Sequence, residues 1–296
     1  MGSLKFELIR RALEHTPSLN LSALCRVAGV SRSGYYHHVS SFSNKLVRDK
    51  FAVEVITKAF EKSRRRAGII TLEMSLRAQG LVINHKKIAR IKRQHGLHTL
   101  IRKRNPYRDI PLKSKEHRTI PNLLKRDFYP PLPNQIFSTD MTYLFYGNCE
   151  RAYLSATKDL CTNEIVSFKL MRRPNIDSFV AEFEGLIKNI PKNRRAELII
   201  HSDQGFQYTH PKFQSTLKIA GIRQSMSRRG NCLDNAPIES FFGHLKDSLE
   251  LKKCGSYEDV NKEVERCMRF YNYERPQKAL NKKPPAEYRG LFSGFY

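Results

Sequence analysis

The stretch AELIIHSDQGFQYTH, residues 196–210, is the clearest indication of an α/β fold in this sequence. Its apolar run ELII predicts a short buried strand that leads directly into Asp203. Open α/β sheets bind their ligands beyond the carboxyl ends of the strands, so this acid stands where a functional site is expected. Gly205 suits a close approach of the backbone to a ligand. Gln207 either contacts that ligand or shapes the loop.

The segments on both sides of this stretch complete an α/β pattern. IFSTDMTYLFY, residues 136–146, is rich in β-branched and aromatic residues and predicts a strand that carries Asp140. The strand pattern continues to about residue 171, and residues 175–190 have helical spacing. A helix near residues 211–220, a short strand at RQSMS and a final helix follow. This order predicts a mixed sheet with helices on its faces.

The final helix carries an acid in its first turn. NAPIESFFGHLK, residues 235–246, holds Glu239 shortly after a proline. Such an acid complements the positive end of the helix dipole, and this ordinary explanation competes with a functional one. Lys246 lies seven residues later, which returns to nearly the same helical face. Asn235 precedes the helix and either orders the loop or contacts a ligand.

The composition indicates a polyanionic partner. The chain carries 53 Lys and Arg against 28 Asp and Glu, a net charge of +25, and nucleic acid is the commonest polyanion. Residues 1–130 hold 28 of these cations and only 9 of the acids. No apolar run reaches the roughly 20 residues of a membrane span, and neither an export signal nor a CxxC pair occurs. We therefore expect a cytoplasmic protein that binds DNA, has reduced thiols and has no membrane partner.

Two helical units are predicted before the α/β region. In residues 1–45, LNLSALCRVAGVSRSGYYHH places Gly29 at a turn and Ser31 at the start of a second, short helix. This is the pattern of a helix-turn-helix, and equally of any small helical hairpin. In residues 46–105, a second helix-turn-helix is predicted, with Asn84 capping the helix HKKIARIKRQHG.

The capped helix of the second unit is the candidate DNA-contacting element. Its isoleucines are predicted to face inward, and five cations are predicted to cover the rest of its surface: Lys86, Lys87, Arg90, Lys92 and Arg93. Such a helix suits the phosphates or the major groove of DNA. A solvated basic face would have the same pattern.

Residues 106–133 predict a basic, proline-containing linker, because prolines recur and hydrophobic periodicity fades. It either follows a phosphate backbone between the domains or serves as a flexible connector.

Three acids on separate elements suggest a metal site. Asp140, Asp203 and Glu239 would repel one another if they met without a cation. Mg²⁺ prefers carboxylate, water and phosphate oxygens. Two such ions about 3.5–4 Å apart can hold the attacking and leaving oxygens of a phosphodiester. The chain thus offers acids for metal and a basic surface for DNA.

The sequence motifs around these acids resemble those of a known family. TDMTY, HSDQGFQYT and GNCLDNAPIESFFGHLK are similar to the three acidic motifs of DDE transposases and retroviral-type integrases. Asp203 and Glu239 are separated by 35 residues, the DD(35)E spacing of that family. YNYERPQKALNKKPPAEY, residues 271–288, resembles the C-terminal signature of the orfB-type catalytic subunit of two-reading-frame bacterial insertion sequences. The resemblance covers nearly the whole chain.

The resemblance implies a ribonuclease-H-like integrase core over residues 134–290, including a C-terminal helical extension. It implies that Asp140, Asp203 and Glu239 bind two Mg²⁺ ions, which Mn²⁺ can replace. The implied reaction is strand cleavage at the element ends by water, then transfer of the freed 3′-hydroxyl to target DNA. The implied partners are DNA, further copies of the chain on that DNA, and the product of an upstream reading frame, separate or fused. By the same match, Lys246 lies toward a phosphate.

Two positions depart from the family pattern. The tryptophan usual before the first acid is Phe137, and the histidine often found after the C-terminal Arg-Pro is Gln277. Neither is a predicted metal ligand. Asp159 and His201 are assigned to the structural framework. Two other interpretations stay open: a DNA-binding regulator with an inactive core, and a ribonuclease-H-like nuclease without strand transfer.

Overall fold

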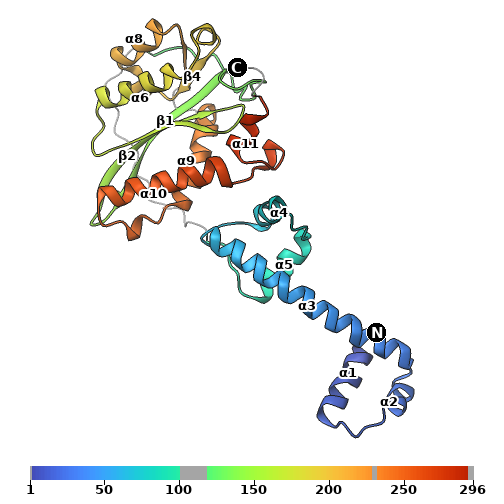
Figure 1. Cartoon of the computed structure of the whole chain (residues 1–296). Helices are drawn as coiled ribbons and strands as arrows, with labels where there is room; N and C mark the ends of the chain where they lie inside the picture. Colours follow the sequence, from blue (N-terminus) through green and yellow to red (C-terminus); the bar gives the residue numbers. More distant parts are fainter. Residues whose placement is uncertain (1, 101–118, 229–231, 293–296) are drawn as a thin grey trace. The chain divides into compact units, whose positions relative to one another are not determined.

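The computed structural model describes residues 2–100, 119–228 and 232–292, without the side chains of residues 2–3, 41–48 and 232. The chain divides into an N-terminal unit, Met1–His98, and a core unit, Thr99–Tyr296. Each unit is described by itself (Figure 1). None of the helices among the described residues combines the length and apolar character needed to cross a membrane.

The N-terminal unit is entirely helical. Its elements are α1 Gly2–His15, α2 Leu21–Ala28, α3 Arg32–Lys62, α4 Ile69–Ala78 and α5 His85–Gln94. The predicted caps are present: Gly29 ends α2 with a φ of 64°, the Ser31 side chain accepts the N–H of Gly34, and the Asn84 side chain accepts the N–H of Lys86. Local side-chain capping therefore sets these helix boundaries, as the sequence predicts.

The helix that begins after Ser31 is long, whereas a short one was expected. No glycine or proline occurs between Tyr35 and Lys62, so nothing in the sequence ends it early. One end of α3 supplies Tyr35 to a small cluster with Ile9 and Cys25, while its other end packs against α4 and α5. The boundary expected at residues 45–46 thus falls inside α3.

The core unit is built on a five-stranded mixed sheet. Its strands are β1 Ile136–Tyr146, β2 Glu150–Asp159, β3 Ile165–Met171, β4 Ile199–Ser202 and β5 Arg223–Met226, in the order β3-β2-β1-β4-β5. β1 is antiparallel to β2 and parallel to β4, and β4 is parallel to β5. The predicted mixed sheet is confirmed, and the turn between β2 and β3 contains Asn163, whose φ is 58°.

Helices cover both faces of this sheet (Figure 1). On one face, α6 Ile176–Lys188 and α8 Pro211–Ile219 pack against strand residues such as Phe137. On the other, α9 Ala236–Ser248 and α10 Tyr257–Arg269 pack against Leu144 and its neighbours. The remaining short elements are η1 Lys192–Arg194, α7 Phe206–Thr209, η2 Cys232–Asn235, η3 Leu251–Lys253, η4 Phe270–Glu274, η5 Lys278–Leu280 and α11 Pro285–Gly290.

The second half of the predicted linker belongs to the core. Residues 106–118 lie outside the described part of the chain. Leu123, in contrast, donates its N–H to Oγ of Ser225 at 2.9 Å, and Leu124 is buried. From residue 120 onward the chain is therefore anchored beside β5, because its apolar side chains and backbone donors find partners there.

The C-terminal extension is also anchored. Nη2 of Arg289 in α11 lies 2.7 Å from the buried carboxylate of Asp159, which also accepts the N–H of Asn134 at 3.0 Å. Asp159 is thus engaged in closing the core, in line with its assignment to the framework.

Candidate active site

The three predicted acids come from neighbouring elements of the core unit. Asp140 lies in β1, Asp203 directly follows β4, and Glu239 lies in the first turn of α9. The parallel register of β1 and β4, continued by two residues, sets Asp140 level with Asp203. Asp140 also shares its face of β1 with Leu144, which packs with α9. The topology therefore brings the third acid toward the first two.

The acids affect one another electrostatically. Burial first, and then the charge of Asp203, raise the pKa of Asp140 to about 8, and Glu239 adds to the rise. The N–H of Met141 donates to Oδ1 of Asp140 at 2.7 Å and opposes it. Burial also raises the pKa of Asp203, against a hydrogen bond from the N–H of Gly205 at 2.8 Å. Such a cluster favours a proton or a cation between its carboxylates.

The donor set suits a hard divalent cation. Carboxylate oxygens are the ligands that Mg²⁺ prefers, and a divalent charge would offset the repulsion that acts on Asp140. Within the described residues, however, no three acid, histidine or cysteine side chains already converge as a metal-binding group. Glu239 is exposed at the start of its helix. The structure thus gathers the three acids in one region without closing them into a ligand cluster, as repulsion between bare carboxylates favours.

Metal binding is expected to show in thermal stability. With Mn²⁺ at about 100 times its dissociation constant, binding to the folded chain alone would stabilise it by about 2.7 kcal/mol. Asp140→Asn removes a ligand and also relieves repulsion, so the variant should melt at or above the wild-type temperature without metal and gain little from Mn²⁺. Melting curves with and without Mn²⁺, repeated with DNA, measure both effects.

The matched control is Glu184→Gln, which neutralises an exposed acid on α6, an element that carries none of the three acids. It should keep the full wild-type response to metal. An equal metal response in wild type and Asp140→Asn would remove Asp140 from the proposed ligands.

Two predicted DNA contacts lie beside the acids. The positive charge of Lys246 lowers the pKa of Asp140, and its Nζ is 5.2 Å from the ring centroid of Tyr143. Gln207 is half-buried, and its Nε2 is 3.5 Å from the sulfur of Met141. Both side chains therefore lie near Asp140 or its neighbour Met141.

Asn235 is a correction. It was predicted to contact DNA, yet it is only 2% exposed, and its Oδ1 accepts a hydrogen bond from the Ser138 hydroxyl at 3.2 Å. This contact holds the start of α9 against β1. Asn235 therefore orders the approach to Glu239, the other interpretation that its position allowed.

The basic helix α5 offers fewer free cations than predicted. Lys86 and Arg93 are exposed. Lys87 and Arg90 lie 3.0 and 2.9 Å from Asp49 of α3, so part of their charge is already balanced. The predicted surface position of Lys92 is wrong: it is buried, donates to the carbonyl oxygen of Ala67 at 3.3 Å and lies over the ring of Phe60. Its long stem fills the unit's core instead.

Sequence reasoning missed a buried carboxylate that fixes the loop before α9. The side chain of Asp234 is fully buried and is held by Arg126 at 2.9 Å, Arg228 at 2.9 Å and the amide of Asn122 at 3.0 Å. Its carbonyl oxygen lies 2.8 Å from Nε2 of His201. No local sequence pattern predicts that Asp234 is buried and paired, because two of its three side-chain partners come from the segment interpreted as a linker.

Low pH is expected to weaken the ion pairs of Asp234 with Arg126 and Arg228. Arg228 chiefly, and then Arg126, hold the pKa of the Asp234 carboxyl far below its usual range. A carboxyl whose pKa is lower in the folded than in the unfolded chain stabilises the folded chain at pH values above its unfolded pKa, about 3.9. This stabilisation is lost as the pH falls below that value toward the folded pKa. We expect Asp234→Asn to be less stable than wild type at pH 7, with a difference that narrows below about pH 5. Urea unfolding between pH 7 and 3 measures it; a constant difference would contradict the assignment.

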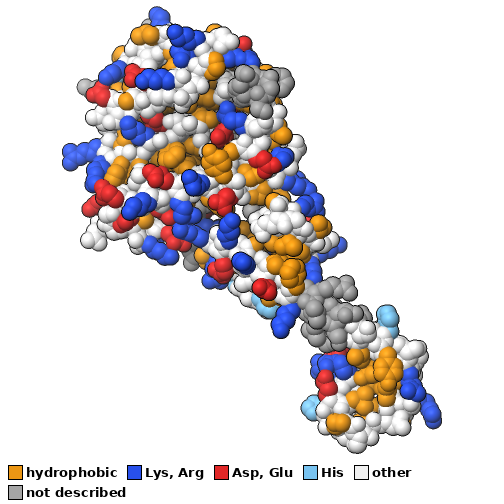
Figure 2. Space-filling view, in the orientation of Figure 1, with side chains coloured by type: hydrophobic (Ala, Val, Ile, Leu, Met, Phe, Trp, Pro, Cys, Tyr) orange, Lys and Arg blue, Asp and Glu red, His pale blue; other side chains and the backbone are white. Residues whose placement is uncertain are grey.

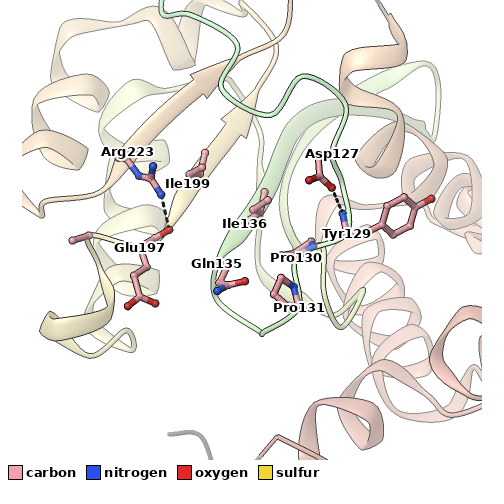
Figure 3. A pocket seen from close by; sticks show the side chains of 10 residues that line it. Asp127, Tyr129, Pro130, Pro131, Gln135, Ile136, Glu197, Ile199 and Arg223 are labelled. Atoms are coloured by element: carbon pink, nitrogen blue, oxygen red, sulfur yellow. Dashed lines mark hydrogen bonds between the residues drawn. The ribbon is translucent and has the colours of Figure 1, made fainter.

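A pocket lies at the opposite end of the parallel strands (Figure 3). It has a volume of ≈ 640 Å³, and Ile136, Ile199 and Arg223 contribute from the starts of β1, β4 and β5. Arg223 Nη2 donates to the carbonyl oxygen of Glu197 at 3.1 Å within it. Because sites of open α/β sheets lie beyond the carboxyl ends of strands, the acids and not this pocket are the candidate site.

Comparison with protein families gives matches over most of the chain. The Integrase core domain matches residues 130–232, a second Integrase core domain family matches residues 220–285, and the HTH-like domain matches residues 47–105.

Curated proteins and solved structures give matches as well. The chain is 35% identical over 272 residues to the putative transposase InsK for insertion sequence element IS150 of Escherichia coli, covering 91% of this chain and 93% of that protein. It is 34% identical over 239 residues to the transposase InsF for insertion sequence IS3A of the same organism, covering 79% and 80%. The HTLV-2 integrase catalytic core domain in complex with magnesium aligns with a TM-score of 0.44 at 17% identity, over 53% of this chain and 97% of that one.

Proposed function

Because this chain belongs to the insertion-sequence transposases that carry an integrase core domain, we propose that it cuts DNA at the ends of its element and joins the freed 3′ ends to target DNA, with Asp140, Asp203 and Glu239 as a DD(35)E site. The observation that carries the proposal is the register of the sheet, which sets Asp140 of β1 level with Asp203 at the end of the neighbouring β4. The raised pKa of Asp140, caused by burial and by the charges of Asp203 and Glu239, agrees with this placement. Like charges held close together are costly to maintain without a role in binding cations.

The proposed ligands of the metal are these three carboxylates, two held on the sheet and one on α9. Two bound Mg²⁺ ions, replaceable by Mn²⁺, would supply polarisation of the phosphodiester and an activated attacking oxygen. The ammonium of Lys246 would hold a phosphate of the bound strand beside Asp140. Gln207, whose Nε2 contacts the sulfur of Met141, would orient the same strand.

A protein nucleophile is not needed for this chemistry. The Tyr208 hydroxyl, on α7, is one that could form an ester, but the side chain is 1% exposed and its oxygen lies 3.3 Å from the Thr139 hydroxyl. Burial raises its pKa well above the usual range. In the proposed reaction water and then a DNA 3′-hydroxyl are the nucleophiles, and no covalent protein–DNA intermediate forms.

The N-terminal unit would hold the DNA. The exposed Lys86 and Arg93 of α5, with Lys87 and Arg90 beside Asp49, form a basic helix within the residues that match the HTH-like domain. Such a helix can bind phosphates at the element end while the core acts on the cleavage site. Several copies on one DNA, and the product of an upstream reading frame as partner or fusion, complete the proposed assembly.

The test is incubation of the protein with end-labelled DNA from the flanks of its own gene in Mg²⁺. Nicks at specific positions, followed by joined products, are the expected result. A DNA-binding regulator with an inactive core would bind the same DNA and leave it intact. A nuclease without strand transfer would give nicks and no joined product.

A further inference from the structure

Two aromatic side chains stand exposed on β1 just beyond Asp140. Tyr143 is 43% and Phe145 is 47% exposed, and their ring centroids are 5.2 Å apart with planes at 74°. The alternate residues, Leu144 and Tyr146, are buried in the core with α9 and α10. The two-residue period of the strand therefore leaves these two rings exposed on the face of β1 opposite to Leu144 and Asp140.

A cation accompanies each of these rings. Nζ of Lys246 is 5.2 Å from the Tyr143 centroid, and Cζ of Arg151 is 5.2 Å from the Phe145 centroid. Arg151 is placed by the antiparallel register, which sets it directly opposite Phe145. The same Lys246 acts electrostatically on Asp140. The two rings and the two cations thus form one track, which Lys246 connects electrostatically to Asp140.

Rings interleaved with cations match the chemistry of single-stranded nucleic acid. Bases stack on exposed aromatic rings, and neighbouring cations bind the phosphates between them. A base within a duplex has both faces covered by its neighbours, so only an unpaired base can reach a ring in this way. On the face of the core unit visible in Figure 2, lysines and arginines are spread among hydrophobic and acidic side chains. A track with this spacing is therefore not explained by overall charge alone.

We propose that Tyr143 and Phe145 form a stacking platform for unpaired bases of the DNA strand that is cut at the acids. The proposal rests on the proposed function and specifies its substrate as an end with locally opened base pairs. Lys246 and Arg151 hold the phosphates that flank the stacked bases. Opening the end in this way frees the cut strand to approach Asp140.

The first measurement is photo-crosslinking of the full chain to DNA from the flanks of its gene. The DNA carries 5-iodouracil in its terminal nucleotides, and no divalent metal is present, so cleavage plays no part. We expect crosslinks within residues 141–151 when the terminal bases are mismatched, and few when they are paired. Crosslinks only outside this segment would overturn the platform.

The second measurement compares affinities for a mismatched and a fully paired end. Tyr143→Leu should weaken binding to the mismatched end by roughly 10-fold and leave the paired end unchanged. Tyr143→Trp should restore the preference, because it restores a ring. Tyr273→Leu, which removes an exposed aromatic elsewhere in the core unit, should behave as wild type.

Other outcomes separate the two proposals. Equal weakening on both ends, or a changed oligomeric state of Tyr143→Leu in gel filtration, would show that the rings serve a general or protein-binding surface and would overturn the platform. Crosslinks at residues 141–151 in a protein that never cleaves with Mg²⁺ would support the platform and count against the proposed activity.

Discussion

Replacement of Asp140 by Asn, Asp203 by Asn or Glu239 by Gln is expected to lower DNA cleavage in Mg²⁺ by roughly 10³-fold or more. Each change keeps the size of the side chain and removes one anionic metal ligand, and loss of about 4 kcal/mol of stabilisation at the transferring phosphate corresponds to that factor. DNA affinity should stay within a few-fold of wild type, because most of the proposed DNA-binding surface lies in the N-terminal unit. Single-turnover cleavage of labelled element ends, with a parallel binding assay, measures both quantities.

The control for these variants is Asp177→Asn. Asp177 is an exposed acid at the start of α6 that pairs with Lys212, so its loss changes net charge as much as the others do. It should cut at the wild-type rate. Near-normal cleavage by any one of the three site variants would remove that residue from the proposed site, and loss of cleavage in Asp177→Asn would show that charge alone is responsible.

The N-terminal unit, residues 1–98, is expected to bind DNA on its own, with an affinity that falls about 100-fold between 50 and 200 mM salt. Four phosphate contacts from α5 predict a slope of about −3.6 for the logarithm of affinity against the logarithm of salt concentration. Lys86→Ala combined with Arg93→Ala removes the two exposed contacts and should make the slope shallower by about 2. Fluorescence anisotropy across a salt series gives these slopes.

Lys92→Met provides the matched control in the same helix. Lys92 is buried over Phe60, so replacing it with an apolar side chain of similar length should leave the salt slope unchanged. A slope that does not respond to the double substitution would mean that α5 is not the phosphate-binding helix. A slope that responds to Lys92→Met would mean that this lysine leaves the core when DNA binds.

The sequence predicts the fold well where local rules are strong. The strand that carries Asp140, the cap at Ser31 and the cap at Asn84 each follow from a few neighbouring residues, and each is present in the structure. The length of α3 was misjudged because no residue after Tyr35 ends the helix. Its later turns are stabilised by packing against α4 and α5, which are distant in sequence. Lys92 was misplaced because helical periodicity alone does not show which long side chain bends inward.

The candidate site was predictable in part. Asp140, Asp203 and Glu239 are linked by spacing and by strand order, and the structure brings them into electrostatic contact. Whether they bind metal stays a prediction. Asp234 was not predictable, because Arg126 approaches it from 108 residues away. The exposed rings of β1 were also missed, since an aromatic strand residue is as readily buried as exposed and only the packed sheet distinguishes the two.

The covering of the sheet has a consequence for the order of synthesis. β1 must wait for β4 to be made before it gains its parallel neighbour, and Val260 and Val264 of α10 are needed to cover the face that holds Leu144. The helical N-terminal unit is therefore synthesised long before the core can close. Translation interrupted between residues 240 and 256 would leave a chain that contains all three acids but exposes apolar sheet surface, which makes it a substrate for proteases. A cell in which translation stalls there is thus expected to degrade the unfinished core before it can act on DNA.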